Sequence, residues 1–391
     1  MRKLDNGRSN VNIIVSKICH RIFSTGFGVT IADQVVVSLG NLISVALIAR
    51  LCGIQQFGLF SLIWMLIQLT QMVVSAVVIT PMINDRAKLP ARYHKFHDRV
   101  VLEHGLVLSI IVTLVFLFSA LLIRFFHPGA LLWGSDFWAA SAIFVLTFAD
   151  FVRRRAFAVR KPSNALGQDI IRYALLLSAL LSLQVNVVVY DVNETVAFAI
   201  LAFANGIAIL YGFSQQGIGQ SNNRLRWFVW KKQRKQAAAL GLDTIVGFLS
   251  SNLQFFMLFT WLGPAALGGV RAGYNVARFS SVFTQATQNW FPALQAKYYS
   301  QGGLVELKKI SIRASVFFGT AQIPILLLII FKGSDIMMIL YGAQYKEYTG
   351  IMIIFAACQV IVGMQVAMIG YFRVLSASGV LLRARCITAV I

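Results

Sequence analysis

The chain has 391 residues, of which 58% are hydrophobic and only 13% charged, and its mean hydropathy is +0.73. Soluble domains are about half apolar and roughly a quarter charged, so this composition excludes one soluble core. The formal charge of +21 would suggest nucleic-acid binding in a soluble protein, so the positions of the basic residues must decide what the charge means.

Apolar stretches of about 20 residues recur along nearly the whole chain, which is the length of a helix that crosses roughly 30 Å of hydrocarbon. They predict an all-α polytopic membrane protein with about ten crossings. We place the spans near residues 28–50, 57–81, 100–123, 137–151, 170–190, 195–216, 237–261, 265–291, 313–332 and 349–372.

Basic residues alternate between the loops that join these spans. Those in the N-terminus and the even-numbered loops are Arg2, Lys3, Arg8, Lys17, Arg21, Arg86, Lys88, Arg92, Lys95, Arg99, Arg153, Arg154, Arg155, Arg160, Lys161, Arg224, Arg226, Lys231, Lys232, Arg234, Lys235, Lys297, Lys308, Lys309, Arg313, Arg373, Arg383 and Arg385. The odd-numbered loops carry only Arg50, Arg124, Lys332 and Lys346. The positive-inside rule therefore predicts a cytoplasmic N-terminus, and the charge requires no nucleic acid.

The N-terminal segment, residues 1–27, lacks the continuous apolar region and cleavage site of a signal peptide. Its apolar residues lie opposite Lys17 and Arg21, which predicts a short helix on the inner leaflet. The scattered cysteines and the histidines near the second basic loop show no metal-ligand spacing, so we expect neither a metal nor a cofactor.

The chain resembles itself at an offset of about 210 residues. At offset 210 the pairs are Asp33 and Asp243, Gly53 and Gly263, and Gly58 and Gly268; at offset 211 they are Asn41 and Asn252, and Pro81 and Pro292. Equivalent positions are six spans apart, so both halves enter the membrane in the same direction and are related by an axis along the membrane normal. The alternative is chance matching among glycine-rich apolar segments.

The repeat predicts a domain organisation of two six-helix lobes. The first lobe covers residues 28–216, a basic cytoplasmic linker covers residues 217–236, and the second lobe covers residues 237–391. Because Ile391 corresponds to Leu181, in the middle of the fifth span of the first lobe, we expect the second lobe to be truncated in its fifth helix. The ten spans are then an incomplete set of twelve.

Polar residues inside spans are costly, so a polar stripe on one helix face indicates function. In the eighth span, about 80° of arc at roughly 100° per residue holds such a stripe, which consists of Arg271, Asn275, Arg278, Gln285 and Asn289. The second span carries Trp64, Gln68, Gln71 and Ser75, the seventh carries Asp243, Ser250 and Gln254, and the first carries Asp33, Asn41 and Ser44. These faces predict a hydrated cavity between the lobes.

The chemistry of that cavity leaves alternatives open. Arg271 and Arg278 suit a phosphate or diphosphate, which guanidinium groups bind in a forked geometry. The alternative is an internal salt bridge, for instance between Arg278 and Asp243. Asp33 and Asp243 suit a coupling proton or cation, or else they stabilise helix N-termini, because both lie near predicted helix starts.

Three stretches resemble the polysaccharide-transporter flippases, bacterial proteins of the superfamily that also contains the multidrug and toxic-compound exporters. The run from Ala32 through Asn41 and Ala49 to Gly53 and Gly58 resembles their first hairpin. Phe151 to Ala156, with Asp169 and Arg172, is similar to the loop before their fifth span, and Gly273, Tyr274, Asn275, Ala277 and Pro292 resemble their eighth span. The resemblance implies two six-helix lobes, alternating access, and a cavity lined by the first, second, seventh and eighth spans.

The favoured hypothesis is a flippase that moves a polyprenyl-diphosphate-linked oligosaccharide across the bacterial cytoplasmic (inner) membrane for O-antigen, capsule or exopolysaccharide biosynthesis. Arg271 and Arg278 would hold the diphosphate, while Asn275 and Gln68 would contact sugar, with Gln71, Gln254 and Gln285 also lining the cavity. Expected partners are this substrate, anionic membrane lipids and, in the same process, a polysaccharide polymerase and glycosyltransferases.

Three alternatives remain at this point. A cation-coupled multidrug exporter would need an acidic or aromatic cavity centre, which Arg278 disfavours. An inactive remnant of a flippase would explain the unfinished repeat. A membrane glycosyltransferase or polymerase would need catalytic groups in a large outward loop, and the odd-numbered loops are short, so we do not expect an enzyme.

Overall fold

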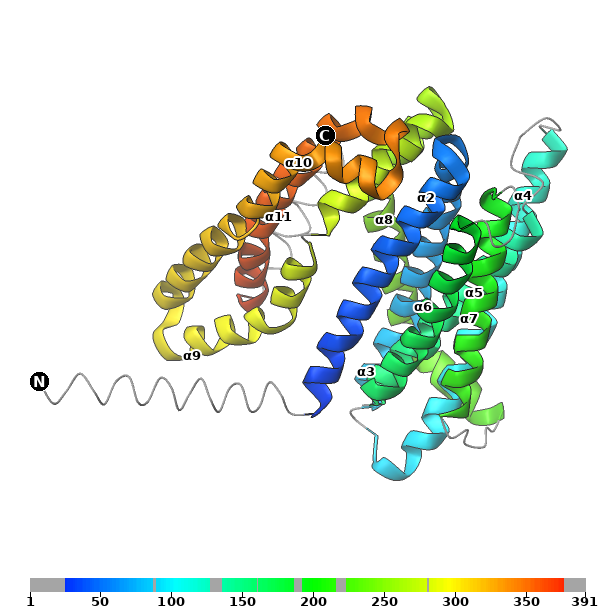
Figure 1. Cartoon of the computed structure of the whole chain (residues 1–391). Coiled ribbons are helices and arrows are strands. Elements are labelled where there is room, and N and C mark those ends of the chain that lie inside the picture. The colour runs from blue at the N-terminus through cyan, green and yellow to red at the C-terminus, as the bar shows by residue number, and fades with distance from the viewer. Residues whose placement is uncertain are drawn as a thin grey trace, which may run out of the picture. The chain divides into compact units, whose positions relative to one another are not determined.

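The computed structural model describes residues 25–86, 89–126, 136–159, 161–185, 192–215, 223–279 and 281–375. Within these ranges the chain is helical and contains no strand (Figure 1). The elements are α2 (Thr25–Val74), η1 (Ser75–Ile79), α3 (Thr80–Arg86), η2 (Ala91–Tyr93), α4 (His94–Phe126), α5 (Asp136–Ala158), α6 (Pro162–Gln184), α7 (Glu194–Ser214), α8 (Asn223–Arg278), α9 (Ser281–Thr320), α10 (Ile323–Tyr341), η3 (Ala343–Tyr348) and α11 (Thr349–Val374). The predicted all-α fold class is confirmed.

Seven helical segments of the described chain are long and apolar enough to cross a membrane. Three of them, with 56, 43 and 48 residues, exceed the roughly 20 residues that one crossing needs, and each is interrupted by a kink or turn. The arrangement fits the predicted number, at about nine to ten spans. The predicted interfacial helix in residues 1–27 lies almost entirely outside the described residues, which begin at Thr25. The predicted truncated helix at the C-terminal end lies beyond the last described residue, Leu375.

Two of the interruptions are equivalent glycines of the predicted repeat. Gly53 divides α2 with φ 75° and ψ 170°, and Gly263 divides α8 with φ 83° and ψ −179°. Only glycine readily adopts this backbone region, because a side chain would clash there. Each glycine therefore turns one long helix into a hairpin of two spans, at the offset of 210 residues that the sequence predicts.

The two hairpins touch through a second pair of equivalent glycines. A Cβ atom on Gly58 would overlap the carbonyl group of Pro264, and one on Gly268 would overlap the carbonyl group of Ile54. Ile54 and Pro264 are themselves 210 residues apart. Each hairpin therefore places its glycine against the equivalent carbonyl group of the other hairpin. This reciprocity confirms the internal duplication in the region of the hairpins.

Two predicted boundaries differ from the structure. α8 begins at Asn223, so the second part of the predicted basic linker is the first part of the seventh-span helix. The predicted ninth span at 313–332 is divided by a turn at Ala321 and Gln322, because Pro324 enters the first turn of α10 without a backbone N–H group.

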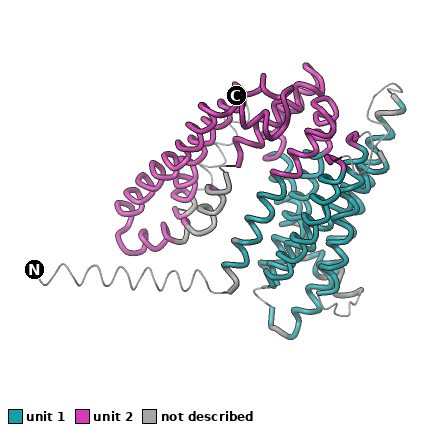
Figure 2. Tube along the Cα trace, viewed as in Figure 1, with its two compact units in different colours: residues 1–41, 64–182, 195–246 teal, residues 42–63, 183–194, 247–391 magenta. Residues whose placement is uncertain are grey.

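The chain forms two compact units (Figure 2). Unit 1 contains the described parts of residues 1–41, 64–182 and 195–246, and its core joins the end of α2 with η1, α3, α4 and α5 around Phe148 and Phe151. Unit 2 contains those of residues 42–63, 183–194 and 247–391, with α9 and α10 packed against α11. These units do not follow the predicted lobes, whose boundaries stay a prediction.

The glycine hairpins generate a stability prediction. Replacing Gly53 or Gly263 with alanine forces a side chain into a glycine-only conformation, so we expect each variant to lose about 1–3 kcal/mol of stability. The matched control is Gly247→Ala in α8, where no atom lies within 4 Å of an added Cβ. Alanine should be neutral or slightly stabilising there. Thermal unfolding of the purified protein in detergent measures all three, and equal melting temperatures would contradict the prediction.

Candidate functional site

The site is built on the segment of α8 that follows the Gly263 kink. This segment carries Gly269 and Gly273, which are one helical turn apart. A Cβ on Gly269 would overlap the ring of Tyr348, and one on Gly273 would lie 3.2 Å from the Cβ of Met352. Because these positions have no side chains, η3 and α11 approach α8 closely, and the neighbouring Arg271 is enclosed with only 3% of its surface exposed.

Aromatic rings surround the Arg271 guanidinium. Its Cζ atom lies 4.8 Å from the ring centroid of Phe255 and 5.4 Å from that of Tyr274. Both rings can stabilise the positive charge through their faces. However, the buried Nε donor has no hydrogen-bond partner in the described structure. Burying an unpaired donor of this kind costs free energy, so a hydrogen-bond acceptor from a ligand would stabilise this site.

Arg278 shares Tyr274 with Arg271. It is the last residue of α8, its side chain is exposed, and its Cζ atom lies 5.8 Å from the Tyr274 ring centroid. Asn275 is half-buried, one turn beyond Arg271. Among the described residues of unit 2, no carboxylate forms a salt bridge with either guanidinium. The result is a pair of arginines bridged by an aromatic ring and lacking an acidic partner in their own unit.

The prediction of one continuous helix over 265–291 is wrong. α8 ends at Arg278 and α9 begins at Ser281, and the Phe279 N–H donates to the Val276 carbonyl at 3.1 Å in a tightened last turn. Gln285 and Asn289 therefore lie on a second helix, and their side chains fall outside the described structure.

The break between α8 and α9 falls inside a stretch that the sequence predicts to be one membrane span. Unpaired backbone groups are tolerated there only where they are buried in protein or line an aqueous cavity. Binding sites of transporters are commonly built from such interrupted helices. The break divides the predicted polar stripe, because Arg271, Asn275 and Arg278 lie on α8 while Gln285 and Asn289 lie on α9, and the cavity itself stays a prediction.

The predicted glutamines have different surroundings. Gln254 is exposed in unit 2 and directly precedes Phe255. Gln68 is half-buried in unit 1, and Gln71 in the same unit donates from Nε2 to the Leu146 carbonyl at 3.2 Å. Gln71 therefore joins α2 to α5 as a structural contact. The rings of Phe255 and Tyr274 belong to the cluster but were not among the predicted site residues.

Asp33 lies in a buried network of charges in unit 1. Arg153 donates to both Asp33 and Asp169, and Arg172 lies 3.8 Å from Asp169. The Asp33 and Asp169 side chains are 2% and 1% exposed. Two arginines thus balance two aspartates. The motif around Arg153, Asp169 and Arg172 has a structural explanation, because it ties α2, α5 and α6 together.

The alternative role of the aspartates at helix N-termini is wrong. Asp33 lies more than two turns after the start of α2 at Thr25, and Asp243 lies far inside α8, which begins at Asn223. The helix dipole acts mainly within the first turn. Asp243 is exposed in unit 1. A role for either residue in coupling a proton or cation stays a prediction.

The charge network generates a second prediction. Asp33→Asn leaves a buried excess positive charge, and breaking one partner of a buried pair costs about 3–5 kcal/mol. The double variant Asp33→Asn with Arg153→Gln removes one charge of each sign, so it should be more stable than Asp33→Asn alone. Arg154→Gln is the control, because Arg154 pairs with Asp150 within one helix and is 42% exposed. It should cost less than about 1 kcal/mol.

Thermal unfolding in detergent measures the stability of these variants. Transport driven by a proton gradient in vesicles tests whether Asp33 also couples transport to protons. If the double variant regains stability, the network is structural in the expected way. If Asp33→Asn unfolds like the unmodified protein but loses its response to a proton gradient, Asp33 acts in coupling and the structural interpretation fails.

Comparisons with known proteins show the fold. No family model matches the chain, and no curated protein matches its sequence. A variant of the Vibrio cholerae MATE transporter VcmN is 15% identical with a TM-score of 0.61, covering 95% of this chain and 87% of that chain. An inward-facing multidrug resistance MATE transporter of the MOP superfamily is 14% identical with a TM-score of 0.62, covering 89% and 88%.

A MOP superfamily transporter from Pyrococcus furiosus is 12% identical with a TM-score of 0.57, covering 89% of this chain and 84% of that chain. At these identities the similarity concerns the fold. The chain therefore has the two-lobe helical fold of the MATE transporters of the MOP superfamily.

Proposed function

We propose that the chain is a membrane transporter for an anionic, lipid-linked substrate, and that this substrate is a polyprenyl-diphosphate-linked oligosaccharide. One observation carries the proposal: Arg271 and Arg278 share the ring of Tyr274 and have no carboxylate partner among the described residues of their unit. A diphosphate would supply the missing negative charge. Guanidinium groups bind phosphate oxygens through paired N–H donors, whereas Lys would offer only a point charge.

The roles of the side chains follow from their chemistry. The Arg271 guanidinium lies over the rings of Phe255 and Tyr274, and that of Arg278 over Tyr274, and aromatic rings leave the N–H donors without an acceptor, so phosphate oxygens can bind them. Asn275, one turn from Arg271, offers an amide group for a sugar hydroxyl. The break between α8 and α9 beside Arg278 is a place where the helices can move separately during alternating access.

The resemblance of three sequence stretches to polysaccharide-transporter flippases supports the oligosaccharide as the cargo. In that case the protein lies in the bacterial inner membrane with its N-terminus in the cytoplasm, as the basic loops predict. It would act between glycosyltransferases, which assemble the lipid-linked unit, and a polymerase that consumes it. Similarity of the fold to MATE transporters is consistent with a transport step between them.

A multidrug exporter is the second candidate. It is favoured by the structural neighbours, of which two are described as multidrug resistance MATE transporters. An organic cation would be repelled by Arg271 and Arg278, and this counts against it. The Pyrococcus furiosus neighbour is described as having a binding pocket of reverse polarity that suggests a different function. The fold thus accommodates pockets of different charge.

The arginine pair generates the test of the proposed function. Arg271→Ala and Arg278→Ala should each slow the translocation of a fluorescent polyprenyl-diphosphate glycan in proteoliposomes by roughly ten- to a hundredfold. This follows from about 1.5–3 kcal/mol for a hydrogen bond to a charged group. Arg271→Lys and Arg278→Lys should recover only part of the rate, because lysine lacks the forked geometry.

The control is Arg313→Ala, which removes an exposed arginine of α9 in the same unit. It should leave the translocation rate unchanged. Ethidium efflux from the same proteoliposomes gives the second readout. The flippase would be rejected, and the exporter favoured, if the unmodified protein exports ethidium and either does not translocate the glycan or does so at the same rate after both arginines are replaced.

A further inference from the structure

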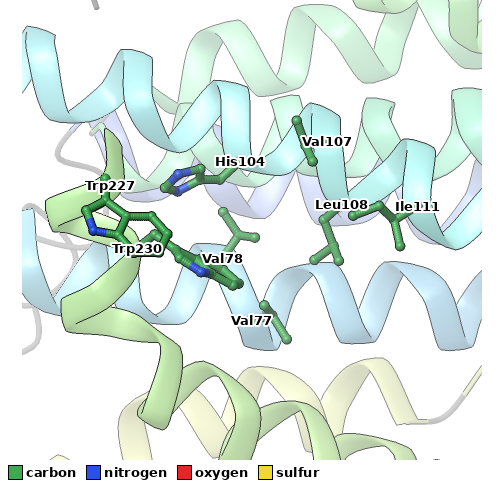
Figure 3. Close-up of a pocket in the computed structure, with 8 residues that line it drawn as sticks. All are labelled: Val77, Val78, His104, Val107, Leu108, Ile111, Trp227 and Trp230. Atoms are coloured by element: carbon green, nitrogen blue, oxygen red, sulfur yellow. The ribbon is translucent and has the colours of Figure 1, made fainter. Parts of the chain in front are cut away.

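Unit 1 has a lateral apolar groove that the proposed function does not use. It has a volume of about 420 Å³ and lies between η1, α4 and the first turns of α8 (Figure 3). We call it the tryptophan groove, and its lining residues are Val77, Val78, His104, Val107, Leu108, Ile111, Trp227 and Trp230.

Specific contacts hold the walls of this groove in place. Gln233, which is buried on α8, donates from Nε2 to Asp85 at the end of α3 at 2.6 Å. A Cβ on Gly241 would lie 3.0 Å from a methyl group of Val77, so α8 lies close to the π-helix η1. The ring of Trp230 meets that of His104 at 5.8 Å in an edge-on arrangement. The groove is therefore a feature built by three elements.

The lining of the groove is apolar except at one end, where it includes polar atoms of His104 and of the tryptophans. Trp227, Trp230 and His104 lie together at one end, while Leu108 and Ile111 lie toward the other (Figure 3). Trp227 is 63% exposed and Ile111 is 48% exposed, so the groove opens at the surface of its unit. Tryptophan is enriched in membrane proteins where hydrocarbon meets head groups, so an apolar opening bordered by Trp227 suits contact with lipid.

Basic residues share the helix face of the two tryptophans. Counted from Trp227, the residues Trp230, Lys231 and Arg234 follow at the spacing i+3, i+4 and i+7, within about 100° of arc. Lys231 and Arg234 are exposed. The sequence from 217 to 242 contains no acidic residue, so the basic side chains of α8 meet no opposite charge on their own segment; Asp85 of α3 accepts from Gln233.

We propose that the tryptophan groove binds one hydrocarbon chain of an anionic phospholipid, whose acidic head group lies beside Lys231 and Arg234. The volume is near the lower end of the roughly 300–1,000 Å³ that small ligands occupy, which suits one acyl chain better than a long polyprenyl chain. Each basic residue near an anionic head group adds attraction, so an acidic phospholipid is preferred over a zwitterionic one. The proposal does not depend on the proposed cargo.

Native mass spectrometry of the full chain tests the head-group part of the proposal. The protein is titrated with phosphatidylglycerol and with phosphatidylcholine of the same acyl chains, and the unmodified protein should prefer phosphatidylglycerol. K231E/R234E should weaken phosphatidylglycerol binding about tenfold or more and abolish the preference, as expected for two basic residues. K308E/R313E is the control, because it reverses two exposed charges of α9 and makes the same change in net charge.

Filling the groove tests the hydrocarbon part. Val107→Trp should reduce the binding of both phospholipids, because it occupies the space of the chain. Ile200→Trp is its control, since Ile200 lines a different apolar groove of unit 1. Thermal unfolding checks that the variants are folded. Should Val107→Trp fail to fold, Ile111→Trp fills the same groove from an exposed position.

The outcomes separate this proposal from its alternatives. Equal binding of the two phospholipids by the unmodified protein would reject it, as would equal losses in K231E/R234E and K308E/R313E. Unchanged binding in both folded groove-filling variants would also reject it. If polyprenyl phosphate occupies the groove and phosphatidylglycerol does not compete, the occupant is the tail of a transported lipid and the phospholipid assignment is wrong. None of these results bears on the arginine tests above.

Discussion

The arrangement of unit 2 depends on a backbone contact that only glycine permits. Gly58 lies against the carbonyl of Pro264 and Gly268 against the carbonyl of Ile54, so two equivalent hairpins meet without side chains between them. Any larger residue would separate the helices. The same glycine-rich segment continues to Gly269 and Gly273, where η3 and α11 approach. Arg271 lies within this segment, so the close packing that joins the hairpins also encloses a charge.

Two buried arginines of the chain show how differently such a charge can be accommodated. Arg153 in unit 1 contacts two aspartates, and with Arg172 nearby the cluster is electrically balanced. Arg271 in unit 2 contacts aromatic rings, which stabilise a cation by far less than a carboxylate does, and its Nε lacks an acceptor. The Arg153 cluster holds two positive and two negative side chains, although Asp33, Asp169 and Arg172 each keep one buried polar atom without a hydrogen bond. What distinguishes Arg271 is that no carboxylate of the described part of its unit forms a salt bridge with it.

The sequence was sufficient for the features that depend on local pattern. The apolar stretches predict the helices, and the recurrence of Gly53 at Gly263 predicts the equivalent kinks, because backbone conformation at glycine is a local property. The predicted polar stripe was wrong beyond Arg278, because a spacing of 100° per residue applies only within one unbroken helix. The pattern of apolar residues does not predict the tightened turn at Phe279. The position of Phe255 against Arg271 arises across the Gly263 kink, so only tertiary structure reveals it. Tyr274 could have been found, as it lies three residues after Arg271 and four before Arg278.

The duplication is visible in the backbone at the two glycine hairpins but does not extend to charge. At an offset of 210 residues, Arg271, Tyr274 and Arg278 correspond to Ser61, Trp64 and Gln68. Both copies keep an aromatic ring at the middle position, whereas only the second copy carries the cations. Positive charge in only one copy would attract one end of an elongated ligand more than the other. A lipid-linked glycan has this character, with negative charge at the diphosphate and neutral hydroxyl groups beyond it. This asymmetry is the reason why the proposed function assigns a lipid-linked glycan, while a multidrug exporter stays the second candidate.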